Sequence, residues 1–436
     1  MLKRALTIGM AFVGLSIGAG FASGQELLQF FVAFGVPGLI GAVVTALLMC
    51  FVGLVILQLG SYFQATEHSA VLSEYTHPVF ARIFDAAVML TVFSIAMVMF
   101  AGAGTNLNQQ FGLPTWVGSI ILLVLVVALG SLDVNKVSKV IGAATPFIVL
   151  FIVIAAVYSI SHADADFATL EAATQDIATE LPNVAVAVAS YVGFSLVVVV
   201  SMSIVIGGEY LVPRTAGLGG LLGGFIFGSL LVLSVVSLFL KIEQVGHMDM
   251  PMLALVGLIS PEMGVAMSVV IFAMIFNSAL GMSYAMGRRL SAGRPERFRT
   301  MFYLTVAVAF CAGFLGFKRL VSYLFPVLGY IGAVLTVVLI IAWLRDHHLI
   351  RKEVKRRVRI RDLVTLKLHP EMNFTAAHAR ELARRVEASN IDNADLNRTV
   401  HEEVVEKLVA DDSVDFDARD GEAALDESAA EEPTAT

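Results

Sequence analysis

One short segment near the N-terminus combines a carboxylate with residues that interrupt helices. It reads Gly18-Ala19-Gly20-Phe21-Ala22-Ser23-Gly24-Gln25-Glu26 and lies inside a long apolar stretch. Each glycine costs a helix roughly 1 kcal/mol relative to alanine, and three fall within seven residues. Ser23 and Glu26 have the Ser-x-x-Glu spacing of a capping box, in which the serine accepts from a backbone amide and the glutamate reaches back to the cap. The spacing predicts that a helix starts within the apolar stretch.

A helix start at that depth divides a membrane span into two half-helices with an unwound joint. Unwound backbone is tolerated inside a membrane only where it faces protein or a watery cavity, and such helices mark substrate and ion sites in secondary transporters. Glycines can instead serve close packing between helices. Glu26 favours a site, because an ionisable side chain is costly in lipid and usually functional.

Glu26 could serve transport in two ways. The free amides of the second half-helix favour an anion at the joint, where a substrate carboxylate would meet repulsion from Glu26. Either Glu26 takes up a proton when substrate arrives, which would couple transport to a proton gradient, or the substrate presents a cation to it. The sequence leaves both mechanisms open.

The rest of the chain is typical of a multi-span membrane protein. Its 436 residues are 57% hydrophobic and 15% charged, with a mean hydropathy of +0.82, whereas soluble domains carry about 25% charged residues. Apolar runs of about 20 residues are long enough to cross the hydrocarbon core. We expect ten spans, at about 5–32, 36–63, 83–104, 115–131, 137–160, 183–206, 215–240, 262–287, 298–316 and 320–344.

The basic residues indicate the orientation of these spans. With a cytoplasmic N-terminus, eleven lysines and arginines lie in inner loops and three, Lys241, Lys318 and Arg319, lie outside. Inner loops of membrane proteins carry such an excess. We therefore expect a multi-pass protein of the inner or plasma membrane with both termini in the cytoplasm and the acidic loop 161–182 outside.

Two segments suggest an internal repeat. Phe12-Val13-Gly14-Leu15-Ser16 in the first span matches Tyr191-Val192-Gly193-Phe194-Ser195 in the sixth, with three identities. Each segment lies in the first span of a five-span half. Because five is odd, the second half would be inverted relative to the first, an arrangement that builds several transporter folds.

With these features the chain resembles the YkvI-type membrane proteins, which are similar to the amino acid–polyamine–organocation superfamily. The resemblance covers about residues 1–345 and is carried by the Gly18–Glu26 motif. It implies an all-α, LeuT-like inverted repeat of five plus five helices, with a discontinuous first helix. A break in the sixth helix is less clearly implied, because Val197–Val200 follows where paired glycines would be expected.

The resemblance also implies a central site between spans one, three, six and eight. Its substrate-binding residues would be Gly18, Ala19, Gly20, Ser23, Gly24, Glu26, Tyr191, Gly193 and Ser195. A coupling ion would use Glu26 together with Asn277 and Ser278, the counterparts of two adjacent hydroxyl residues on span eight. The two cysteines, Cys50 and Cys311, offer no metal spacing. We expect no cofactor beyond a coupling H⁺ or Na⁺ and leave any metal unassigned.

These features favour a secondary active transporter of a small organic solute, an amino acid or amine, driven by a proton or sodium gradient. A channel would need a continuous polar path or a filter motif, and neither is visible. A membrane-embedded enzyme would need paired catalytic groups. The Gly-x-Ser-x-Gly match at 14–18 does not supply them, because a nucleophile elbow requires a strand-to-helix turn. The interpretation as a receptor would rest only on the cytoplasmic tail.

The composition divides the chain near residue 345. Residues 1–345 are expected to form the transport domain, and residues 346–436 a cytoplasmic tail without a nucleic-acid partner. The tail starts with a basic cluster from Arg351 to Arg361, which anchors the last span or attracts anionic lipid headgroups. Residues 375–389 and 397–410 could form short helices, and the acidic end beyond Ala410 is expected to be disordered.

Overall fold

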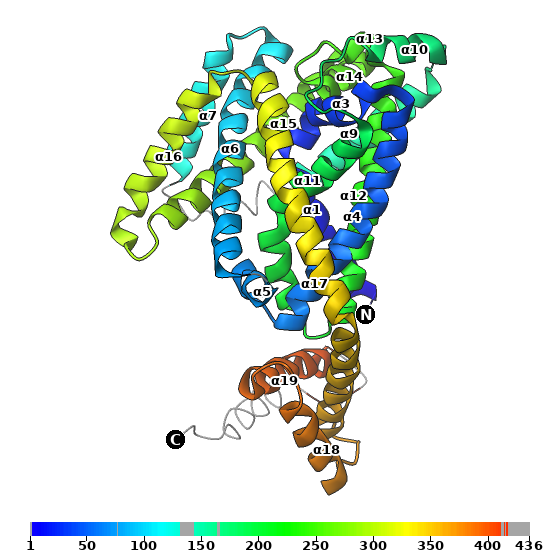
Figure 1. Ribbon diagram of the computed structural model, residues 1–436, viewed down its shortest axis with the longest axis vertical. Helices are drawn as coiled ribbons and strands as arrows, with labels where there is room; N and C mark the ends of the chain where they lie inside the picture. The colour runs from blue at the N-terminus through cyan, green and yellow to red at the C-terminus, as the bar shows by residue number, and fades with distance from the viewer. Residues whose placement is uncertain are drawn as a thin grey trace.

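The structure, a computed structural model, describes residues 2–75, 77–130, 144–163 and 166–410, with Val414 and Phe416. Within these ranges the chain is helical and forms no strand. Figure 1 shows a helical bundle joined by one long helix to a smaller group of helices. The predicted all-α class is confirmed.

Each predicted span overlaps one or more helices of the bundle. The first span comprises three short helices, and the others follow in order. The helices are α1 (Leu2–Ser16), α2 (Ala19–Ser23), α3 (Gln25–Phe30), α4 (Gly35–Phe63), α6 (Pro78–Phe111), α7 (Thr115–Leu129), α9 (Ala144–Ser161), α11 (Val184–Gly208), α12 (Pro213–Leu240), α15 (Pro261–Leu290), α16 (Phe298–Gly313) and α17 (Phe317–Leu368). Residues 137–143 of the predicted fifth span lie outside the described residues.

Apolar length supports a membrane location. Among the described residues, six helical segments are long and apolar enough to cross a membrane: α3 with α4, α6, α11, α12, α15 and α17. Helices α7, α9 and α16 are apolar but shorter. Many large side chains on the bundle surface are apolar, as on the outer face of α4 at Ile40 and Leu47. The chain is therefore a membrane protein, and the number of crossings stays a prediction.

Glycines let the central helices of the bundle approach closely. Gly53 of α4 lies against the backbone of Gly220 in α12, and Gly60 of α4 lies against Ile204 in α11. Gly9 brings α1 against Gly219 and Gly223 of α12, beside the row of glycines that faces α4. Small residues serve helix association in lipid because burying apolar surface gains little there. The bundle core is thus tight around α1, α4, α11 and α12.

The short helices lie at the two ends of the bundle. Figure 1 places α10 (Phe167–Thr174), α13 (Ile242–Val245) and α14 (Pro251–Ile259) at one end. Helix α5 (His68–Tyr75) and the N-terminus lie at the opposite end. The predicted outer loop 161–182 and the N-terminus therefore lie at opposite ends, and which end faces the cytoplasm stays a prediction.

Two helices continue through positions where the sequence suggests a change. Helix α11 has no break, because Asn183 caps its N-terminus and the apolar run Val197–Val200 continues it to Gly208. Helix α17 continues through the basic cluster to Leu368, beyond the predicted end of the last span near residue 344. The composition changes at Arg345, but arginine and lysine are good helix formers and the backbone continues unchanged.

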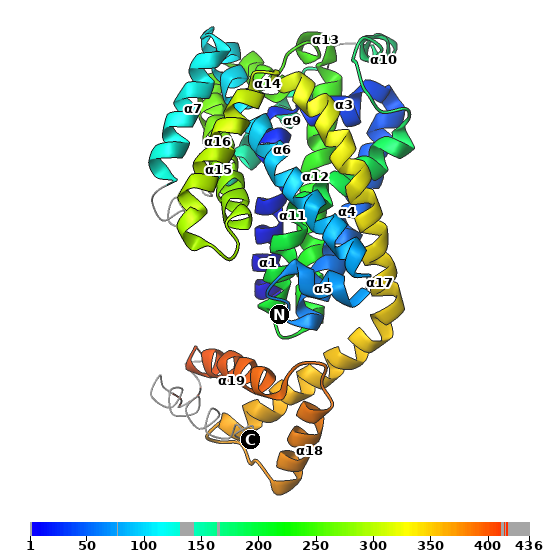
Figure 2. The same ribbon diagram turned by 60° about the vertical axis from the view of Figure 1, so that its left-hand side comes forward.

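The tail packs beneath the bundle. Helices α18 (Ala376–Glu387) and α19 (Asn393–Val409) fold back on the extension of α17, as Figure 2 shows. Val364, Val386 and Val400 belong to a small apolar core there, which also takes in Leu211 and Val212 from the link between α11 and α12. Apart from Val414 and Phe416, the acidic end predicted to be disordered lies outside the described residues.

Candidate functional site

The first span is interrupted twice. Helix α1 ends at Ser16, and Gly18 has an extended backbone (φ −94°, ψ 178°) that separates it from α2. A second turn follows at Gly24, whose φ of +80° is left-handed. The predicted discontinuity of the first helix is confirmed. Its position is corrected, because residues 19–23 are helical and the extended joint lies at Ile17 and Gly18.

Glycine is required at position 24 for two reasons. A left-handed φ strains residues that have a side chain, and a Cβ atom there would lie 2.6 Å from Cγ of Met252 in α14. The turn thus fits only a residue without a side chain. It redirects the chain so that α3 starts at Gln25 and carries Glu26 in its first turn.

The predicted capping box is absent. Ser23 is the last residue of α2, and its hydroxyl donates 2.7 Å back to the Gly20 carbonyl oxygen and accepts from the Gln25 amide at 3.2 Å. Gly24 is the residue that precedes α3, without a side-chain cap. The Glu26 carboxylate reaches another helix instead. The sequence spacing was present, but the left-handed turn at Gly24 separates the two side chains.

Glu26 lies in the interior of the bundle. Its side chain is 4% exposed, and Oε1 accepts a 3.0 Å hydrogen bond from the Tyr191 hydroxyl of α11. Its Oε2 lies over Gly20, where a Cβ atom would come within 2.7 Å of it. The carboxylate is therefore held between the broken first span and α11.

Aromatic packing fixes Tyr191. The ring contacts Phe30 at 5.3 Å and Phe31 at 5.0 Å between centroids, both edge-on. Such pairs stabilise a fixed ring orientation. The hydroxyl of Tyr191 consequently points at Glu26, and the two residues form one rigid unit.

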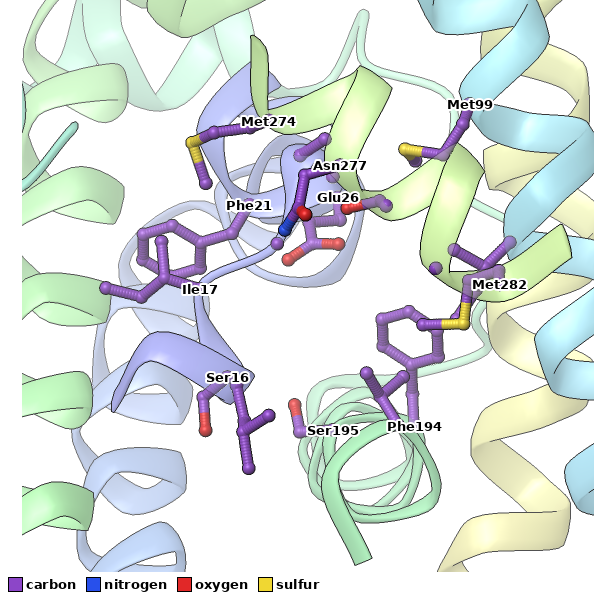
Figure 3. Close-up of a pocket in the computed structure, with 18 of the residues that line it drawn as sticks. Ser16, Ile17, Phe21, Glu26, Met99, Phe194, Ser195, Met274, Asn277 and Met282 are labelled. Carbon is purple, nitrogen blue, oxygen red and sulfur yellow. The ribbon is translucent and has the colours of Figure 1, made fainter. Parts of the chain in front are cut away.

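A cavity of about 240 Å³ opens beside this unit. Figure 3 shows Glu26 and Asn277 on one side of it, with Ser16 and Ser195 opposite. The lining comes from α1, α2, α3, α6, α9, α11, α15 and α17. It consists largely of apolar and sulfur-containing side chains: Leu15, Ile17, Phe21, Ile95, Met99, Phe194, Val198, Met274, Met282 and Phe325.

One charged side chain lines this cavity. Among the described residues around it, Glu26 is acidic and none is basic. The polar groups beside Glu26 are hydroxyls and one amide: Ser16, Thr145, Tyr191, Ser195, Asn277 and Ser278. A buried carboxylate is stable when it is paired or neutralised. The cavity therefore suits a positively charged partner at Glu26 and an apolar group elsewhere.

Most of the residues predicted from the sequence meet at this cavity. Gly18, Ala19, Gly20, Glu26, Tyr191, Ser195, Asn277 and Ser278 line it. Ser23, Gly24 and Gly193 do not. Ser23 is bonded to its own helix and Gly24 packs on Met252, while Gly193 lies against the backbone of Gly329 and Ala333 in α17. These three shape the site through helix geometry and packing.

Sequence reasoning missed the hydrophobic half of the cavity. Phe194 of α11 stacks on Phe325 of α17 with centroids 4.3 Å apart, and three methionines from α6 and α15 contribute further wall. Phe194 lies in the repeated five-residue segment, which was a usable signal. The methionines are indistinguishable in sequence from ordinary core residues.

The comparisons with known proteins come from sequence and from structure. No protein-family model matches the chain. The uncharacterized membrane protein YkvI of Bacillus subtilis (strain 168) is 22% identical over 324 residues, which are 74% of this chain and 92% of that protein. The uncharacterized protein YyaD of the same organism is 25% identical over 337 residues, 76% of this chain and 95% of that protein. This chain is therefore longer than either relative.

A solved structure shows the fold. The structure of MhsT in complex with L-phenylalanine aligns with a TM-score of 0.54 at 12% identity, covering 91% of this chain and 98% of that one. At 12% sequence identity, this structural similarity shows a shared fold. The chain is thus a membrane protein that resembles YkvI and YyaD and has the LeuT-like fold of MhsT.

Proposed function

We propose that the protein is a secondary active transporter of a small organic solute that carries a positively charged amino group, an amino acid or an amine. A proton or sodium gradient drives it, and it resides in the cell membrane with both termini in the cytoplasm. The observation that carries the proposal is the position of Glu26: one buried carboxylate, held by Tyr191, beside a break in the first span and facing a cavity.

The shape and lining of the cavity support this class of solute. The cavity has a volume of about 240 Å³ and joins one charged group to a largely apolar wall. An ammonium group would pair with Glu26, and the rest of the solute would pack between Phe194, Met274 and Met282. MhsT, whose structure contains L-phenylalanine, supports an aromatic or aliphatic side chain as the apolar part.

The coupling ion uses the same corner of the cavity. Asn277 and Ser278 lie on α15 and line the cavity together with Glu26. An amide oxygen, a hydroxyl and a carboxylate are suitable sodium ligands, and Glu26 by itself can carry a proton. The proposal therefore keeps H⁺ and Na⁺ as the two candidates, and transport with each gradient separates them.

Uptake into proteoliposomes tests the function. Radiolabelled amino acids and amines are offered with an imposed proton gradient, an imposed sodium gradient, or neither. We expect accumulation that depends on one gradient and is lost in Glu26→Gln. Glu262→Gln, at the exposed start of α15, is the matched control and should transport normally. Equal uptake without any gradient would indicate a channel instead.

Contacts within the protein occupy part of the basic cluster. Arg357 is buried, and Arg359 and Arg361 form ion pairs with Glu381 and Glu403 of the tail. Arg351, Lys352 and Lys355 remain exposed. We assign any attraction to anionic lipid headgroups to these three, at about 1 kcal/mol each near a charged surface.

A further inference from the structure

The tail is fixed to the bundle by a buried arginine. Arg357 has no exposed surface, and its guanidinium donates to the carbonyl oxygens of Ser61 at 2.8 Å, Tyr62 at 2.7 Å and Leu211 at 2.9 Å. It also donates to Glu353 at 3.0 Å and to the side chain of Asn390, in the link between α18 and α19, at 2.9 Å. One side chain thus joins the extension of α17 to the end of α4, the α11–α12 link and the tail.

The same tail reaches the first turn of α1. Arg4 forms ion pairs with Glu403 and Glu406 of α19, the latter at 3.1 Å. Glu403 also lies 3.6 Å from Arg361 of α17. Helix α19 therefore bridges α17, which Arg357 anchors, and α1. We call the contact of Arg4 with Glu403 and Glu406 the clasp.

The clasp depends on a single basic residue. A second cavity, about 550 Å³, lies between α1 and α19. Its lining includes four carboxylates, Glu209, Glu402, Glu403 and Glu406, and among the described residues around it Arg4 is the one basic group. Like charges gathered in this way repel unless a cation compensates them. Without Arg4, the start of α1 would lose its attraction to α19.

Helix α1 also forms a wall of the central cavity. Gly14, Leu15 and Ser16, in its last turn, line that cavity. The extended backbone at Gly18 interrupts the helix between α1 and α2, which places a candidate hinge between the cavity wall of α1 and Glu26. A tilt that carries the first turn of α1 away from α19 would widen the route from the N-terminal end of the bundle to the cavity.

From these contacts we propose that the tail is a built-in restraint on access to the central cavity: the clasp between Arg4 and α19 holds α1 against the bundle, and its release opens the cavity toward the N-terminal end. The inference rests on the proposed function in one respect: it takes the central cavity as the solute site.

Thiol labelling measures access without any solute. The reporter is Ser195→Cys, because Ser195 is buried and lines the central cavity, in a background with Cys50→Ala and Cys311→Ala. A small maleimide is applied to the purified full-length protein, and the rate of labelling is followed. Arg4→Gln should raise this rate about two- to fivefold, the equilibrium change expected for a partly exposed ion pair.

Two variants make the result specific. Lys3→Gln removes the same charge from the exposed neighbouring position, which does not line the second cavity, and should leave the labelling rate unchanged. Arg4→Lys keeps the positive charge beside Glu403 and Glu406 and should label at a rate close to that of the starting protein. Hydrogen exchange of residues 2–16 should rise in Arg4→Gln and not in Lys3→Gln. Equal labelling and exchange in Arg4→Gln and Lys3→Gln would overturn the proposal, whether or not transport is found.

Discussion

The hydroxyl of Tyr191 donates a 3.0 Å hydrogen bond to Oε1 of Glu26, and this bond joins α11 to the broken first span. Both residues are buried, and the other oxygen of the carboxylate lies over Gly20. The bond fixes where the carboxylate faces the cavity. A substitution that removes the hydroxyl or displaces the carboxylate should therefore change solute binding.

Tyr191→Phe should weaken binding of an amine solute about tenfold. The substitution removes the hydroxyl that orients Glu26, and a hydrogen bond to a charged group is worth about 1.5–3 kcal/mol. Tyr284→Phe, elsewhere in the bundle, is the matched control and should bind as before. The affinity of each purified variant for the amine solute is measured by titration. Equal affinities in both variants would mean that Tyr191 does not position the carboxylate.

Gly20→Ala should reduce binding far more than Gly18→Ala. A Cβ atom at Gly20 would lie 2.7 Å from Oε2 of Glu26 and 3.3 Å from Phe325, whereas at Gly18 it meets nothing within 4 Å. The first variant therefore displaces the carboxylate, and the second leaves it in place. We expect about a tenfold loss of affinity for Gly20→Ala, which corresponds to ~1.4 kcal/mol. A larger loss in Gly18→Ala would contradict the assigned geometry.

Gly24→Ala should destabilise the protein more than Gly112→Ala. Both glycines have a left-handed φ, +80° and +69°, so both variants lose about 1–2 kcal/mol to backbone strain. At Gly24 the new methyl also meets Met252, while at Gly112 nothing lies within 4 Å, and overpacking adds about 1–3 kcal/mol. Melting temperatures in one detergent compare the two. Equal melting temperatures would show that the turn can move away from α14.

The contact between α17 and α18 should weaken in acid. Hydrogen bonds from Arg359 and Arg385 lower the pKa of Glu381 from 4.5 to about 2. Because the pKa in the folded state is lowered, this contribution is complete above about pH 4.5 and is lost as the pH falls toward 2. Hydrogen exchange of α18, corrected for intrinsic rates, should increase over that range. Glu381→Gln should show the increased exchange already at neutral pH, with little further change in acid.

The orientation can be tested with two cysteines. The excess of basic residues at one end predicts that Ser161 lies outside and the turn after α15 inside. Ser291 in that turn is buried, so exposed Ala292 is the better reporter. An impermeant maleimide should label Ser161→Cys in intact cells, and Ala292→Cys only after lysis. The reverse labelling would invert the topology.

Most of the helix positions, and Glu26 as the main acidic group, could be predicted from the sequence. Long apolar runs predicted where the helices lie, and glycines beside Glu26 predicted a broken first span. The helix positions and the break in the first span both follow from residues that are close together in the sequence. The exposed surface of the bundle is apolar because lipid replaces water there, so hydropathy is a direct signal.

The errors have a common physical origin. The spacing of Ser23 and Glu26 fits a capping box, but a left-handed Gly24 between them turns their side chains apart. Gly193 was taken for a site residue, although it serves close approach to α17. The pairing of Arg357 with carbonyls almost 300 positions away in the chain has no local signature at all. Such features depend on tertiary contacts that a short pattern does not encode.

Binding of three related probes shows whether Glu26 binds the positive charge of the solute. Phenethylamine carries only the ammonium group, L-phenylalanine both charges, and 3-phenylpropanoate only the carboxylate. Their affinities are measured on the purified protein and on Glu26→Gln, within a wider panel of amines, amino acids and carboxylic acids. The account predicts that amine-bearing compounds bind, that 3-phenylpropanoate does not, and that Glu26→Gln abolishes the difference. Preferred binding of carboxylic acids, or amine affinities unchanged in Glu26→Gln, would contradict it.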